Sequence, residues 1–132
     1  MADDTEVIME PRSIKAADSE LAESNLALFE RLDFEAWNKR DWGLFRQLHG
    51  KDVIVGGFGQ HTENVDEHVS WAQHYLSNNP DNQIDAHPIR IGAGDWTAVT
   101  GLFNDGSTMA TIARWEDGQV VEEYLFQLVS GH

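Results

Sequence analysis

From Gln83 onward the chain alternates β-type segments with glycine turns, and this alternation constrains the fold more than any other feature. Four segments rich in β-branched and aromatic residues follow one another: QIDAHPIRI, WTAVTGLF, STMATIARW and QVVEEYLFQLV. The turns between them are Gly92-Ala93-Gly94-Asp95, Asn104-Asp105-Gly106 and Glu116-Asp117-Gly118. Because glycine readily takes the left-handed conformation that a tight reversal needs, these turns predict hairpins and a meander of antiparallel strands.

The residues before this region predict helices. Apolar side chains recur at helical spacing from a cap at Asp18 or Ser19 to about Trp37. Asp41 caps a second, short helix, WGLFRQLHG, and Asn64 caps a third helix with an apolar stripe, VDEHVSWAQHYL. A short β-type segment, VIV, lies between the second helix and the third.

Helices followed by strands indicate an α+β fold rather than a doubly wound sheet. We expect a cone-shaped, curved antiparallel sheet packed against about three N-terminal helices, with a hollow between them. Such a hollow is a natural small-molecule pocket. The chain has 132 residues, which fits one domain. We expect an N-terminal arm at 1–17 and a single domain at 18–132.

The composition excludes several classes of protein. There is no cysteine, so a disulfide scaffold, a thiolate zinc site and a cysteine nucleophile are excluded. Nine Lys and Arg against 23 Asp and Glu give a net charge of −14, which repels nucleic acids and anionic membrane surfaces. No apolar run approaches the roughly 18 residues of a membrane span, and no secretory signal opens the chain. We therefore expect a soluble, cytoplasmic protein.

The histidine spacing predicts no metal site. His68 and His74 are six positions apart, so a helix places them roughly 240° apart and they cannot hold one ion. We expect no metal and no cofactor. His68 borders the apolar stripe of the third helix, His61 lies in the glycine-rich loop before it, and His87 lies in a later β-type segment. These three are candidate pocket residues, with a structural role as the competing interpretation.

Large aromatic side chains are numerous, and core or interface packing accounts for most of them. We expect two or three to line the hollow, where flat walls suit a planar apolar ligand. The candidates are Trp42, Trp71, Tyr75 and Trp96.

Five stretches carry a resemblance to a known family: AWNKRDWGLFRQLHGKDVIV, VDEHVSWAQHYL, NPDNQIDAHPIRIG, GDWTAVTG and ATIARWEDGQVVEEYLF. They resemble the SnoaL-like polyketide (ester) cyclase branch of the nuclear transport factor 2-like superfamily. The resemblance implies a conical α+β fold that works without metal or organic cofactor, often as a homodimer. An outer sheet face with Tyr124, Phe126 and Trp115 uncovered also favours a homodimer. In such cyclases a carboxylate removes a proton next to a carbonyl, and an intramolecular aldol closure follows.

The last strand holds the candidate catalytic carboxylate. Alternation sends either Glu122 or Glu123 into the hollow, and the resemblance favours Glu123. An exposed pair on an acidic protein is the competing interpretation. Burial would raise the pKa of Glu123 above about 4.3, and His68 would donate a hydrogen bond to a developing enolate oxygen. The resemblance adds Thr111, at a polar position of the neighbouring strand, and Gln127, at a position where cyclases carry aspartate.

Three functions remain open from the sequence. The leading one is a cofactor-independent lyase or isomerase of the polyketide-cyclase type, acting on an apolar carbonyl compound. The absence of an aspartate after Glu123 favours an alternative, a non-catalytic ligand-binding or dimerisation module on the same fold. A weaker alternative is epoxide hydrolase-like hydration, for which Arg90 and Arg114 are available.

Overall fold

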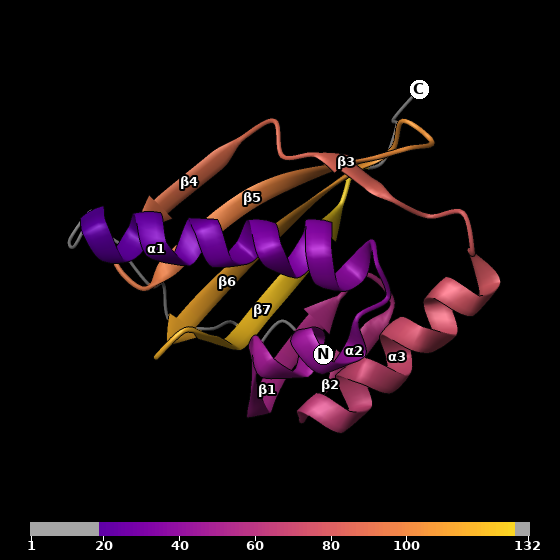
Figure 1. The fold of residues 1–132 in the computed structure, drawn as a ribbon, viewed down its shortest axis with the longest axis horizontal. Coiled ribbons are helices and arrows are strands. Elements are labelled where there is room, and N and C mark those ends of the chain that lie inside the picture. The colour runs from indigo at the N-terminus through magenta and orange to yellow at the C-terminus, as the bar shows by residue number, and fades with distance from the viewer. Residues whose placement is uncertain (1–18, 129–132) are drawn as a thin grey trace, which may run out of the picture.

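The computed structural model describes residues 19–128, in which helices lie over one face of a curved sheet (Figure 1). The helical elements are α1 (Ser19–Glu30), η2 (Arg31–Trp37), α2 (Trp42–Gln47) and α3 (Val65–Asn78). The strands are β1 (His49–Gly57), β2 (Gln60–Thr62), β3 (Ile84–Ala86), β4 (Arg90–Ala93), β5 (Trp96–Phe103), β6 (Thr108–Glu116) and β7 (Gln119–Gln127). The expected arm at 1–17 lies outside the described residues. The α+β cone predicted from the sequence is confirmed.

The helices α2 and α3 begin where their capping residues predict. The side chain of Asp41 accepts the backbone N–H of Leu44 at the start of α2. Asn64 accepts the backbone N–H of Glu67 at the start of α3. The first predicted helix is present, but its second half, η2, has the wider π-type hydrogen bonding. Such segments are uncommon and often occur at functional sites.

The sheet is mixed rather than wholly antiparallel. Its strand order is β2-β1-β7-β6-β5-β3, with β4 also paired to β5. The hairpins β5–β6 and β6–β7 are antiparallel as their glycine turns predict, but β1 pairs with β7 in parallel. The two strands are far apart in sequence, so no turn reveals their pairing. The expected strand QIDAHPIRI divides into β3 and β4 on either side of Pro88, which has no N–H for the ladder.

A glycine lets β1 and β7 approach each other at the end of β1. Gly57 pairs with Leu125 and has φ of 91°. A Cβ at this position would lie 2.1 Å from the carbonyl oxygen of Leu125. The next residue, Phe58, also has positive φ and packs its ring against Trp71 and Tyr75 of α3. The turn thereby places an aromatic ring above the hollow of the sheet.

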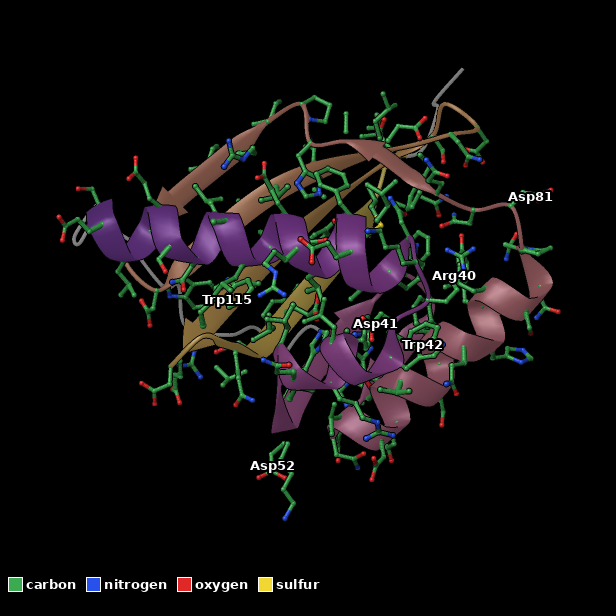
Figure 2. The ribbon with its side chains drawn as sticks, in the orientation of Figure 1. Arg40, Asp41, Trp42, Asp52, Asp81 and Trp115 are labelled. Carbon is green, nitrogen blue, oxygen red and sulfur yellow. The ribbon has the colours of Figure 1, made fainter. Side chains whose placement is uncertain are left out.

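Alternation along β7 brings Glu123 inward. Glu123 and Leu125 are buried, whereas Phe126 is exposed. The ladder with β6 shifts between Arg114 and Trp115, and this bulge also turns Val120 toward the core. The expectation that Trp115 lies on the outer face is wrong, because Trp115 shares the inner face of β6 with Thr111 and Ala113 and its ring meets Phe29 of α1 (Figure 2).

A clamp around Arg40 fixes the loop between α3 and β3. The guanidinium donates hydrogen bonds to the carbonyl oxygens of Pro80 and Asn82. Figure 2 shows Arg40 next to the turn that carries Asp81. The start of β3, which leads into the wall of the cavity, is thereby tied to the end of η2. None of the helices within 19–128 has the length and apolar character that a membrane crossing requires.

Candidate active site

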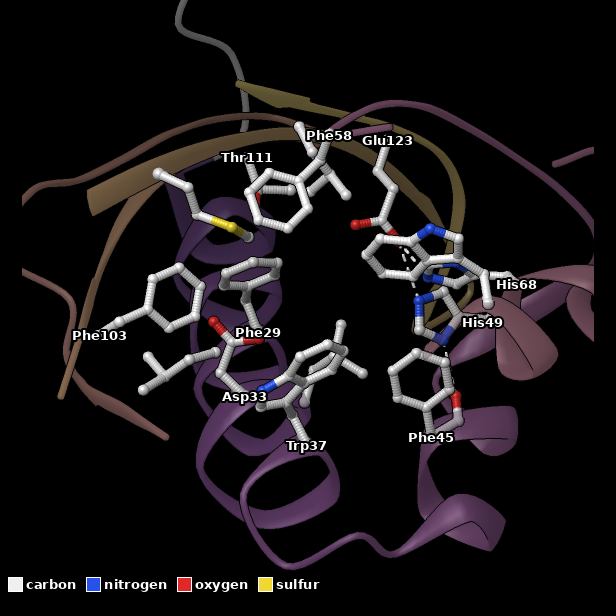
Figure 3. A pocket seen from close by; sticks show the side chains of 15 residues that line it. Phe29, Asp33, Trp37, Phe45, His49, Phe58, His68, Phe103, Thr111 and Glu123 are labelled. Atoms are coloured by element: carbon white, nitrogen blue, oxygen red, sulfur yellow. Dashed lines mark hydrogen bonds and ion pairs between the residues drawn. The ribbon is translucent and has the colours of Figure 1, made fainter. Parts of the chain in front are cut away.

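A cavity, partly open to solvent, lies between the helices and the concave face of the sheet (Figure 3). Six aromatic side chains line it: Phe29, Trp37, Phe45, Phe58, Trp71 and Phe103. The aliphatic lining consists of Leu32, Ile84, Met109 and Leu125, and the polar lining of Asp33, His49, His68, Thr111 and Glu123. An apolar wall with a few polar groups is typical of small-molecule sites.

Glu123 and two histidines form a hydrogen-bonded cluster on one wall. The Nε2 atom of His49 lies 2.9 Å from Oε1 of Glu123, and Nε2 of His68 lies 3.5 Å from the same oxygen. All three side chains are at most 5% exposed. Figure 3 shows the other oxygen of Glu123 directed into the cavity. This oxygen, Oε2, is therefore the one that a ligand can reach.

The other ring nitrogens fix the histidines in place. Nδ1 of His49 donates to the carbonyl oxygen of Phe45, at 2.7 Å. Nδ1 of His68 lies 3.0 Å from Oε1 of Gln60. The two imidazoles also meet edge to face, with ring centroids 4.8 Å apart. These contacts hold the polar wall rigid beneath Glu123.

The pKa of Glu123 is lowered, which makes the expected increase wrong. Burial does act to raise the pKa of this carboxyl, but the hydrogen bonds and positive charge that His49 and His68 provide outweigh burial. The increase was expected from burial alone, because the sequence indicates no hydrogen-bond partner for the Glu123 carboxylate. Burial lowers the pKa of His68, and the hydrogen bond to Glu123 opposes that effect only in part.

A second buried carboxylate lies on the opposite wall. Asp33 comes from η2, and its Oδ2 lies 2.7 Å from Nε2 of His87. Burial raises the pKa of Asp33, and the charge of Glu123 adds to this effect, while the hydrogen bond with His87 opposes it. Glu123 and Asp33 thus face one cavity with their pKa values displaced in opposite directions.

Sequence reasoning missed Asp33 and gave His49 no role. A signal for Asp33 exists, because it lies one helical turn from both Phe29 and Trp37, inside the apolar stripe of the first helix. A lone carboxylate in such a stripe marks either a paired buried charge or a functional group. No comparable signal marks His49, whose partner is 74 positions away.

The structure brings four of the ten predicted site residues into the cavity lining: Glu123, His68, Trp71 and Thr111. The others lie elsewhere. His61 is exposed and pairs with Glu63, and Gln127 is exposed near the end of β7. His87 lies behind Asp33, and Tyr75 stacks behind Trp71. Trp42 packs on Phe45. Trp96 is the first residue of β5 and lies outside the cavity lining.

The two arginines considered for epoxide hydration also lie outside the cavity lining. Arg90 pairs with Glu30 at the surface, and Arg114 pairs with Glu122 and Glu116.

His49, His68 and Glu123 are also the side chains that could together hold a metal ion. One ligand atom from each lies within 4.8 Å of the others. They come from three different elements, which is why helical spacing could not indicate them. Hydrogen bonds within the cluster and to Phe45 and Gln60 already account for the arrangement without an ion.

Comparison with known proteins identifies the fold. No family model matches the sequence, and no curated protein matches it. Solved structures do match. A candidate ketosteroid isomerase from Kribbella flavida superposes with a TM-score of 0.73 at 20% identity, covering 84% of this chain and 82% of that one. A SnoaL-like protein of unknown function from Burkholderia thailandensis gives 0.72 at 13% identity, covering 83% and 98%.

A third similar structure is a candidate SnoaL-like polyketide cyclase from Jannaschia sp. CCS1. It gives a TM-score of 0.72 at 16% identity and covers 86% of this chain and 91% of that one. The chain therefore has the fold of these SnoaL-like structures, as the sequence resemblance predicted. At these identities the likeness establishes the fold, and the activity has to be argued from the site.

Proposed function

We propose that this protein is an acid–base enzyme that enolises a flat, uncharged carbonyl compound and then isomerises it or closes a ring. The observation that carries this proposal is the pair of buried carboxylates on facing walls of one aromatic cavity. Environments that push the pKa values of two carboxyls apart assign one as the base and the other as the acid. This is the polyketide-cyclase or isomerase chemistry that the sequence favoured, with Asp33 added to it.

Glu123 is the base in this proposal. Its lowered pKa keeps it ionised, and its Oε2 points into the cavity. Oε2 takes a proton from the carbon next to the substrate carbonyl, and the C–H electron pair moves into the enol double bond. In an isomerisation Glu123 returns the proton at another carbon. In a ring closure the enol carbon forms a bond to a second carbonyl carbon, and the π electrons of that carbonyl move to its oxygen. This oxygen takes the proton held by Glu123, while the first carbonyl re-forms and its oxygen returns a proton to Asp33.

Asp33 is the acid. A carboxyl with a raised pKa stays protonated at a pH where Glu123 is ionised, so it can hydrogen-bond the carbonyl oxygen and protonate the enolate. The sequence had indicated His68 for this role. In the structure the two ring nitrogens of His68 already face Gln60 and Glu123, and Asp33 lies across the cavity from the base.

The cavity also limits the substrate. None of its lining residues, all within 19–128, is Lys or Arg, and the two lining histidines already face Glu123. Two buried carboxyls oppose any anion that enters. The aromatic walls favour a planar skeleton. An uncharged polycyclic ketone meets these requirements.

Hydrogen exchange tests the proposal without knowledge of the natural substrate. 2-Tetralone in deuterated buffer, followed by proton NMR, reports enolisation directly. The wild-type chain should accelerate exchange at the carbons next to the carbonyl. Glu123→Gln should reduce that acceleration by roughly 100-fold or more, and Asp33→Asn by about 10- to 100-fold.

Glu122→Gln is the matched control, because Glu122 neighbours Glu123 on the same strand and faces the other side of the sheet. It should exchange at the wild-type rate. If 2-tetralone binds but exchange is no faster than in buffer, the enzyme proposal is wrong and the ligand-binding module takes its place.

A further inference from the structure

His87 is a buried imidazole that the proposed reaction does not yet use. It lies between β3 and β4, and its side chain is 1% exposed. Phe34 stacks on the ring at 4.5 Å between centroids, and Phe29 packs at 5.4 Å. The ring therefore has a fixed orientation, in which Nε2 faces Oδ2 of Asp33 at 2.7 Å.

The other nitrogen of the ring decides which tautomer is present. Nδ1 of His87 is buried and has no hydrogen-bond partner within residues 19–128. A buried N–H without an acceptor is rarer and costlier than a buried lone pair without a donor. A ring protonated at Nδ1, or at both nitrogens, would bury such an N–H. The single proton therefore belongs on Nε2, where Oδ2 of Asp33 accepts it.

This tautomer determines which oxygen of Asp33 can carry a proton. We infer that His87 is a positioning residue that occupies Oδ2 of Asp33 through its Nε2–H, so that the acidic proton resides on Oδ1 and is available to a ligand. If the hydrogen bond ran the other way, the proton would sit between Asp33 and His87 and would be lost to the cavity.

The inference rests on the proposed role of Asp33 as the acid and adds the group that directs its proton. It also agrees with the groups that raise and lower the pKa of Asp33. The negative charge of Glu123 and burial favour the protonated carboxyl, while His49 and His87 favour the carboxylate. Removing the Nε2–H of His87 should therefore make Asp33 harder to ionise.

Two NMR measurements on the full chain test the inference. With 15N-labelled histidine, His87 should show a protonated Nε2 and an unprotonated Nδ1 near neutral pH. With 13C-labelled aspartate, His87→Phe should shift the titration of the Asp33 carboxyl upward by roughly one unit, because the donor is lost. His87→Gln, which can still donate an N–H, should return the titration toward the wild-type value.

His61→Phe is the matched control, because His61 is an exposed histidine outside the cavity lining, and it should leave the Asp33 titration unchanged. A proton on Nδ1 of His87 in the wild-type chain, or an unshifted Asp33 titration in a folded His87→Phe, would overturn the inference. The wild-type spectrum decides the tautomer even if His87→Phe does not fold. Neither readout needs turnover, so a failed exchange assay and a failure of the His87–Asp33 arrangement are separate, distinguishable results.

Discussion

At the scale of single residues, the buried carboxyl of Asp33 lowers the free energy of unfolding at neutral pH. Its pKa in the folded chain is raised above the unfolded value, so folding favours the protonated form. The stability contribution of this group is complete below the unfolded pKa of about 3.9 and is lost as the pH rises through the raised value. At neutral pH, burial in the folded chain therefore opposes the ionised form that the Asp33 carboxyl takes in the unfolded chain.

Asp33→Asn should remove that cost while its side-chain oxygen still accepts the N–H of His87. We expect the variant to be more stable than wild type at neutral pH by about 1 kcal/mol for each unit of pKa shift removed, and to lose this advantage in acid. Urea denaturation at neutral and at acidic pH measures the difference. A variant less stable than wild type at neutral pH would show that Asp33 stabilises the fold.

The same residues show how far a sequence can predict a site. Glu123 was identified from strand alternation and family resemblance, and the structure buries it in the cavity. The direction of its pKa could not be predicted, because that depends on His49, which approaches across a parallel strand pair. Short-range patterns show which face a side chain takes. They do not show which distant side chain meets it there.

At the scale of elements, local signals predicted most of the helix starts and hairpins. Caps at Asp41 and Asn64 and the glycine turns act over a few residues, so the sequence displays them directly. The parallel pairing of β1 with β7 and the π-type turn of η2 were not predicted. The strand pairing joins segments far apart in the chain, which no local pattern records.

Gly57 provides a test at this scale. A Cβ there would lie 2.1 Å from the carbonyl oxygen of Leu125, and φ is 91°. Gly57→Ala must therefore push β1 from β7, and we expect a loss of roughly 2–3 kcal/mol in the free energy of unfolding. Gly59→Ala is the control, since φ is 79° but nothing lies within 4 Å of the added carbon. It should cost about 1 kcal/mol, from backbone strain alone. Equal losses in the two variants, measured by urea denaturation, would contradict the close approach.

At the scale of the whole molecule, the outer face of the sheet carries an apolar row. The strand registers align Ile91 of β4 with Ala98 of β5, Ile112 of β6 and Tyr124 of β7 in one row. Ile91 is 59% exposed, and Phe126, nearby on β7, is 54% exposed. A continuous apolar row on a chain of net charge −14 is costly to leave in water.

We propose that a second copy of the chain covers this face, because the row is uncharged and two acidic chains can meet there with the least repulsion. Light scattering at micromolar concentration should then give about twice the 14.9 kDa of one chain. Ile112→Asp, in the middle of the row, should give the single-chain mass while circular dichroism stays unchanged. Arg46→Asp, on α2 at the helical side, is a charge-changing control and should remain dimeric. A wild-type mass near 14.9 kDa would show that the chain does not dimerise through the apolar row.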